Sequence, residues 1–169
     1  MKRIGLFFVA LLLLCLLFAV GVCAKEINTQ VRGTQDITGA LEGADSGDTV
    51  NITLNSDIDL AQTVQINKSI TVNVYFNGYT VRYNGTAGKD TTTAAFHISK
   101  AGATLNLVGS NPLADYKAYT HYGENVKADM VGTGNLVAVS FGTVSIRDAY
   151  FYATDAFVMN RLFMPILTC

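Results

Sequence analysis

Apolar and uncharged polar residues alternate along most of the chain after residue 48. Val, Ile and Leu recur at every second position of short segments, and Thr, Asn, Gln and Ser fill the positions between them. A period of two is typical of β-strands that bury one face. The pattern predicts strands at 49–54, 63–66, 69–76, 80–83, 94–98, 104–108, 136–141, 143–146, 149–152 and 156–159.

A helical period precedes these segments. In residues 35–46 the apolar residues, among them Ile37 and Leu41, recur at spacings of three and four. This spacing predicts one short amphipathic helix, with Thr34 or Asp36 as its N-cap. A Ser-Gly-Asp turn follows the helix and marks the change of period.

Corners separate the predicted strands more often than hairpin turns do. The two-residue Asn-Gly signals are confined to 77–78 and 84–85, and most other segments end in a single Gly, Asn or Asp. Short strands joined by corners favour a parallel β-solenoid over a sandwich or a barrel. We expect solenoid coils over 49–169, a loop that projects at 110–132, and an N-terminal segment at 25–48 that contains the helix.

The first two dozen residues have the pattern of an export signal. Lys2 and Arg3 precede an uncharged apolar run over 4–22, and Ala24 supplies a small residue at the end. The sequence therefore predicts a signal peptide over 1–24, cleavage after Ala24, and a secreted or cell-surface protein.

Two alternatives to cleavage stay open. The apolar run reaches the roughly 18 residues that a membrane-spanning helix needs, so an uncleaved N-terminal segment would anchor the chain. Lipidation at Cys23 would need a small residue before the cysteine, and Val22 is not one. Intact-mass measurement on exported protein distinguishes the three cases.

Three segments resemble the opening coils of right-handed parallel β-helix proteins of the pectin-lyase-like class, and especially its adhesin-like surface proteins. They are Gly-Asp-Thr-Val at 47–50, Asn-Lys-Ser-Ile-Thr-Val at 67–72 and Asn-Gly-Tyr-Thr-Val at 77–81. The likeness covers 35–110 well and 133–160 loosely. It implies an all-β fold, a short right-handed parallel β-helix with an N-terminal capping helix. Since such β-helices continue for many more coils, we interpret this chain as the product of a truncated gene. The alternative is that Phe163, Met164, Ile166 and Leu167 form a lid across the last coil.

Charge excludes one class of partner. Twelve basic residues stand against thirteen acidic ones, for a net charge of -1, and no basic stretch is present that would neutralise a row of phosphates. We therefore expect no nucleic-acid partner.

Catalytic signals are weak in this sequence. The pectin-lyase-like enzymes to which the chain is similar cut acidic polysaccharides with clustered carboxylates, and here the close pair is Asp57 and Asp59. This pair is a weak candidate for a Ca²⁺ site, and a solvated corner is the alternative. His97 is expected on the outer face of its strand and His121 in the projecting loop, so they form no metal signature. We also find no Ser, Cys or Thr with an evident base, and we expect no catalysis and no cofactor.

The projecting loop offers a candidate ligand site. Tyr116, Tyr119 and Tyr122 would share one face of a helical turn and present an aromatic platform to a sugar ring. The alternative is that their rings pack on the flank of the β-helix. Alanine substitution of all three separates these readings: lost glycan binding with unchanged melting indicates the platform, and a lower melting temperature indicates packing.

Three triplets have the form of N-glycosylation acceptors. They begin at Asn51, Asn67 and Asn84, and Asn84 is the best candidate because it lies in a predicted turn.

The leading functional hypothesis is a non-enzymatic adhesin-like module that contacts surface glycans or other cell-surface proteins. A polysaccharide lyase or hydrolase relative and a purely structural surface-layer element are the alternatives. The similarity to enzymes is an analogy of fold, which is a weak basis for inferring activity.

Overall fold

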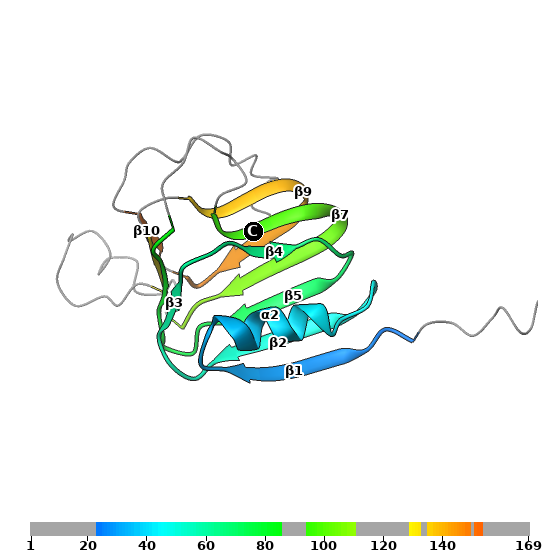
Figure 1. Ribbon diagram of the computed structural model, residues 1–169, viewed down its shortest axis with the longest axis horizontal. Helices are drawn as coiled ribbons and strands as arrows, with labels where there is room; N and C mark the ends of the chain where they lie inside the picture. The colour runs from blue at the N-terminus through cyan, green and yellow to red at the C-terminus, as the bar shows by residue number, and fades with distance from the viewer. Residues whose placement is uncertain (1–22, 86–93, 111–128, 133–134, 150, 154–169) are drawn as a thin grey trace, which may run out of the picture.

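The computed structural model describes residues 23–85, 94–110, 129–132, 135–149 and 151–153 (Figure 1). Within them the protein is all-β apart from one helix. The elements are β1 (Glu26–Val31), α2 (Thr34–Glu42), β2 (Thr49–Leu54), β3 (Ile58–Leu60), β4 (Val64–Ile66), β5 (Thr71–Tyr75), β6 (Val81–Tyr83), β7 (Ala94–Val108), β8 (Met130–Gly132), β9 (Asn135–Arg147) and β10 (Phe151–Ala153). The apolar run at 4–22, the tyrosines of the predicted loop and the predicted strand at 156–159 lie outside the described residues.

All of the described strand pairs are parallel. In the larger sheet β1, β2, β5 and β7 are neighbours in that order, and β4 and β9 also pair with β7. The smaller sheet has the order β10-β8-β6-β3. Figure 1 shows β1, β2, β5, β7 and β9 side by side, with β3 and β10 to their left.

The register places like residues level with one another on neighbouring strands. Thr49 pairs with Thr71, Thr71 with Thr104, and Thr104 with Thr143. The next residue of each strand is apolar and is level with its neighbours in the same way: Val50, Val72, Leu105 and Val144. Because the side-chain period of a strand is two, this register keeps every apolar column on the same face.

The core lies between the two sheets and the helix. Its largest fully buried side chains are Tyr83, Phe76, Phe96, Ile37, Ile52, Leu54, Ile58, Leu60, Ile66, Ile98, Leu105 and Leu107. Burial follows the alternation: β2 and β5 bury every second side chain, while their Thr and Asn residues stay partly exposed. The periodicity of these strands therefore correctly predicted which face is buried.

Helix α2 packs on the strands through Ile37 and Leu41, both buried. Its C-terminal carbonyl groups are bound by Lys68, whose Nζ donates to Leu41 O at 3.2 Å, Glu42 O at 2.8 Å and Ala44 O at 2.6 Å. A cation is favourable at this end of a helix, where carbonyls lack intrahelical partners. The lysine of the Asn-Lys-Ser segment thus ties the helix to the turn between β4 and β5.

Several details differ from the sequence-based expectation. Helix α2 ends at Glu42 instead of residue 46, and its N-cap is Gly33 with no side-chain cap, not Thr34 or Asp36. Asp36 instead accepts a hydrogen bond from Arg32 N at 2.9 Å. Strand β8 occupies the end of the predicted loop at 110–132, because these residues pair with β6.

Candidate functional site

A row of asparagines crosses the open face of the larger sheet. Asn51 Nδ2 donates to Asn28 Oδ1 at 2.8 Å, Asn73 Nδ2 to Asn51 Oδ1 at 2.7 Å, and Asn106 Nδ2 to Asn73 Oδ1 at 2.7 Å. The linked residues are 22, 23 and 33 positions apart in sequence, so the row is produced by strand pairing and not by local structure. Stacked amides that share hydrogen bonds add to the stability of the parallel strands.

Threonines form a second row beside the first. Thr49, Thr71, Thr104 and Thr143 occupy level positions, each two residues before the Asn or Ser of the same strand. Ser145 continues the asparagine row on β9 through its pairing with Asn106. We call these residues, together with Tyr75, the amide–hydroxyl face: Asn28, Thr49, Asn51, Thr71, Asn73, Tyr75, Thr104, Asn106, Thr143 and Ser145.

The ten residues of the amide–hydroxyl face are uncharged, and one carboxylate borders them, because Glu26 Oε1 accepts from Asn51 Nδ2 at 2.6 Å. Tyr75, at the end of β5, adds an aromatic ring that is 38% exposed. Hydroxyl and amide groups both donate and accept hydrogen bonds, and a tyrosine ring offers an apolar surface with a polar edge. This chemistry suits an uncharged polyhydroxylated ligand.

His97 lies in a second polar cluster that spans three strands. Its Nδ1 is 2.9 Å from Gln65 Oε1 on β4, and its Nε2 is 2.8 Å from Ser140 Oγ on β9. His97 lies on the opposite face of β7 from Phe96 and Ile98, as expected, but it is buried and not on the surface. Ser140 lies where the pairing of β7 and β9 is irregular: Ile98 pairs with Val139 and the next residue, Ser99, with Phe141.

Ser140, His97 and Gln65 form a hydrogen-bonded series that the sequence pattern did not predict. With Gln65 Oε1 as acceptor, Nδ1 carries the proton and Nε2 accepts from the Ser140 hydroxyl. A glutamine fixes this tautomer but is neutral, so it does not stabilise the imidazolium as a carboxylate would. The contacts also satisfy every polar atom of the buried ring, which is a sufficient structural reason for the cluster.

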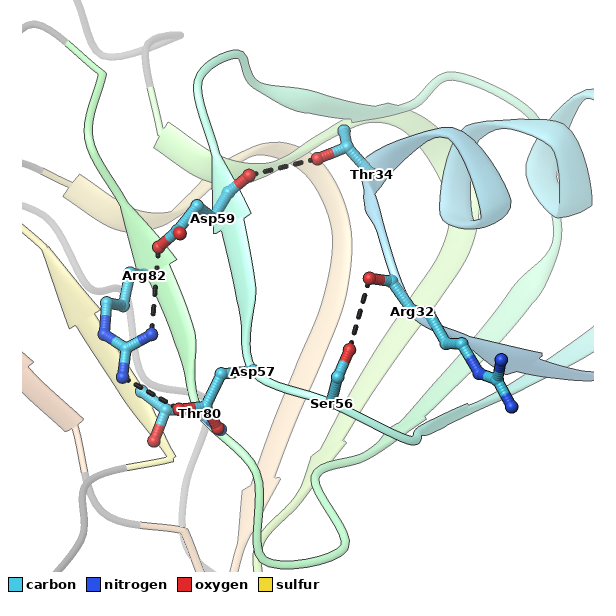
Figure 2. A network of polar contacts seen from close by, with 7 residues as sticks. All are labelled: Arg32, Thr34, Ser56, Asp57, Asp59, Thr80 and Arg82. Carbon is cyan, nitrogen blue, oxygen red and sulfur yellow. Dashed lines mark hydrogen bonds and ion pairs between the residues drawn. The ribbon is translucent and has the colours of Figure 1, made fainter.

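Asp57 and Asp59 both lie near the guanidinium group of Arg82. Arg82 Nη2 lies 2.8 Å from Asp57 Oδ2, and Arg82 Nη1 lies 3.8 Å from Asp59 Oδ1 (Figure 2). Thr80 N also donates to Asp57 Oδ1 at 2.9 Å. The guanidinium already neutralises charge at this carboxylate pair, which disfavours a Ca²⁺ ion there.

The ion pairs join β3 and the residue before it to the neighbouring strand β6. In the same region Thr34 Oγ1 donates to Asp59 O and Ser56 Oγ to Arg32 O, both at 3.2 Å (Figure 2). Exposed ion pairs contribute about 0.2–1 kcal/mol, so we assign the cluster a positioning role at the corner between β2 and β3. Among the residues that the structure describes, no group of three His, Cys, Asp or Glu is arranged to hold a metal ion.

The glycosylation triplets occupy different environments. Both N–H groups of Asn51 are engaged, since Nδ2 donates to Glu26 Oε1 as well as to Asn28 Oδ1. A glycan at Asn51 would break the asparagine row. Asn67 and Asn84 are exposed and each lies directly before a bend.

Tyr116, Tyr119, Tyr122 and His121 lie outside the described residues, so the aromatic platform stays a prediction. Within the described part of the chain, no helix has both the length and the apolar character needed to cross a membrane. Comparison with protein-family models, with curated proteins and with solved structures gave no match.

Proposed function

We propose that the chain winds as a short right-handed parallel β-helix with α2 as its N-terminal cap. Three sets of strands recur in a fixed order: β2, β3, β4, then β5, β6 and the first half of β7, then its second half, β8 and the start of β9. Parallel crossover connections are almost always right-handed, which supports that hand. The contacts of α2 with β1, β2, β3 and β4 support the capping role.

On this scaffold we propose a secreted or cell-surface adhesin-like module that binds surface glycans through the amide–hydroxyl face. The observation that carries the proposal is the continuous asparagine row, flanked by threonines and by the exposed ring of Tyr75. The strands hold these groups in place before a ligand arrives, so binding loses little side-chain entropy.

Glycan-array binding tests the face. We expect Tyr75→Ala to weaken binding at least about tenfold while the melting temperature falls little, because Tyr75 lies on the outer face and is not among the buried core residues. Asn67→Ala, an exposed residue outside the face, is the matched control and should bind as the unmodified chain does. Equal binding by the two variants would contradict the assignment of the face.

The second candidate is a lyase or hydrolase relative, and the Ser140–His97–Gln65 cluster is the observation that favours chemistry of some kind. Release of unsaturated or reducing sugar from uronate polymers would support it over a binding module. Absence of both glycan binding and sugar release would leave the third candidate, a structural surface element.

A further inference from the structure

The backbone nitrogen of Lys25 is hydrogen-bonded to a buried carboxylate. Lys25 N donates to Asp48 Oδ1 at 2.7 Å, and Asp45 N donates to Asp48 Oδ2 at 2.8 Å. The Asp48 residue is 2% exposed. The backbone hydrogen bonds from Asp45 and Lys25, helped by the positive charges of Lys25 and Lys68, lower the pKa of the Asp48 carboxyl below its usual value of 3.8.

Lys25 is also the residue at which the sequence predicts the mature chain to begin. Cys23 and Ala24 are exposed and belong to no helix or strand, so the peptide bond between Ala24 and Lys25 is open to a peptidase. On its other side Lys25 is fixed, because Thr49 N donates to Lys25 O at 2.9 Å and β1 begins at the next residue.

We propose that the Ala24–Lys25 bond is a processing site, and that the α-ammonium group it frees binds the Asp48 carboxylate as an internal ion pair that fastens β1 to β2. Hydrolysis breaks the C–N bond: Ala24 keeps the carbonyl carbon and gains the water oxygen as a carboxylate, and Lys25 keeps the nitrogen. This inference rests on the export part of the proposed function and adds what cleavage does to the fold.

Cleavage changes the strength of this contact without moving its atoms. Before cleavage the nitrogen is a neutral amide with one donor; afterwards it is a cation with three. Hydrogen bonds between a cation and a carboxylate are roughly twice as strong as neutral ones, and exclusion of water at Asp48 favours the pair further. No other charge displaces the ammonium among the described neighbours: Lys25 Nζ and Lys68 Nζ bind backbone carbonyls, and the side chain of Asp45 is exposed.

Thermal unfolding of two chains tests the pair. One begins at Lys25 and the other keeps Cys23 and Ala24, both released from a fusion by a specific protease. We expect the chain that begins at Lys25 to melt about 4 °C or more above the longer one at pH 6, and Asp48→Asn to abolish the difference. Equal melting temperatures of the two unmodified chains would overturn the inference.

The pH dependence has a definite sign. The higher melting temperature of the chain that begins at Lys25 should be fully present below the ordinary α-amino pKa of about 7.7–8.0. It should be lost as pH rises through the pKa of the paired ammonium, which pairing raises. It is also lost at the acid end, as pH falls through the lowered pKa of Asp48. A melting difference that stays constant from pH 6 to pH 10 would contradict the ion pair.

A labelling measurement keeps the test valid if Asp48→Asn does not fold. The α-amine of the chain that begins at Lys25 should react with an amine-acetylating reagent at least about fivefold more slowly than the α-amine of the longer chain, because it is bound to a carboxylate. Equal rates would overturn the inference. The intact mass of exported protein tests processing separately. A mass that shows no cleavage after Ala24 would contradict the processing site, whereas equal melting and labelling of the two chains would contradict the ion pair.

Discussion

Replacing Ile52 by Ala is expected to lower the free energy of unfolding by about 2–5 kcal/mol, since it deletes a fully buried side chain and leaves a cavity. Ile52 is 0% exposed on β2 and lies level with Val74 on β5, which is level with Leu107 on β7. The substitution would therefore remove packing contacts shared by β2, β5 and β7. Urea unfolding, with the slope of the transition unchanged, measures it.

The same column supplies a matched control. Ile146 on β9 pairs with Leu107 and is the last described residue of the column, with 41% of its surface exposed. We expect Ile146→Ala to cost about 1 kcal/mol or less, because little apolar surface is removed from the core. An equal loss at both positions would contradict the ordering of the strands from β2 to β9.

Replacing Gly142 by Ala is expected to cost at least about 2 kcal/mol. Gly142 adopts a φ of 99°, a left-handed conformation that costs residues with a Cβ about 1–2 kcal/mol. An added Cβ would also lie 2.6 Å from Ala103 O and 3.0 Å from Lys100 O, both backbone atoms of the neighbouring strand. The strain arises at the bend of β9, so the midpoint of unfolding should shift to a lower temperature and a lower urea concentration.

Gly39 is the control for this substitution. It lies within α2, and a Cβ added there meets nothing within 4 Å. We expect Gly39→Ala to raise the free energy of unfolding by about 0.5–1 kcal/mol, since alanine loses less backbone entropy in a helix. A loss of stability at Gly39, or none at Gly142, would contradict the local geometry.

Strand periodicity carried most of the fold prediction. Residues 49–54 form β2 with the predicted bounds, because alternation there is strict and both neighbours are in register. Segments 94–98 and 104–108, predicted as separate strands, form the single strand β7, as 136–141 and 143–146 do in β9. Glycines with positive φ, Gly102 and Gly142, bend these strands where a Gly corner suggested an end.

Strands β1, β3 and β8 were not predicted. Strands β3 and β8 have three residues each, and both pair with β6 in the smaller sheet. The Asn-Gly pair at 77–78 has the positive φ angles of a hairpin turn, but β5 and β6 lie in different sheets, so it makes a corner instead. Turn chemistry fixes a local bend and leaves the pairing of the strands open.

The side-chain clusters depended on contacts across strands. Arg82 reaches Asp57 across 25 residues and His97 reaches Ser140 across 43, distances at which no sequence pattern links the partners. The register of β7 and β9 decides both the His97 cluster and the last rungs of the polar rows. The alternation predicted only which Thr and Asn residues face outward.

Disulfide formation between engineered cysteines tests the order of the stacked strands most directly. In a chain whose own cysteines are replaced by Ser, we expect Asn51→Cys with Asn73→Cys to form a disulfide readily, because these residues are level on adjacent strands about 4.8 Å apart. Asn51→Cys with Asn106→Cys should stay reduced, since β5 lies between them. Cross-linking of the second pair but not the first would contradict the account.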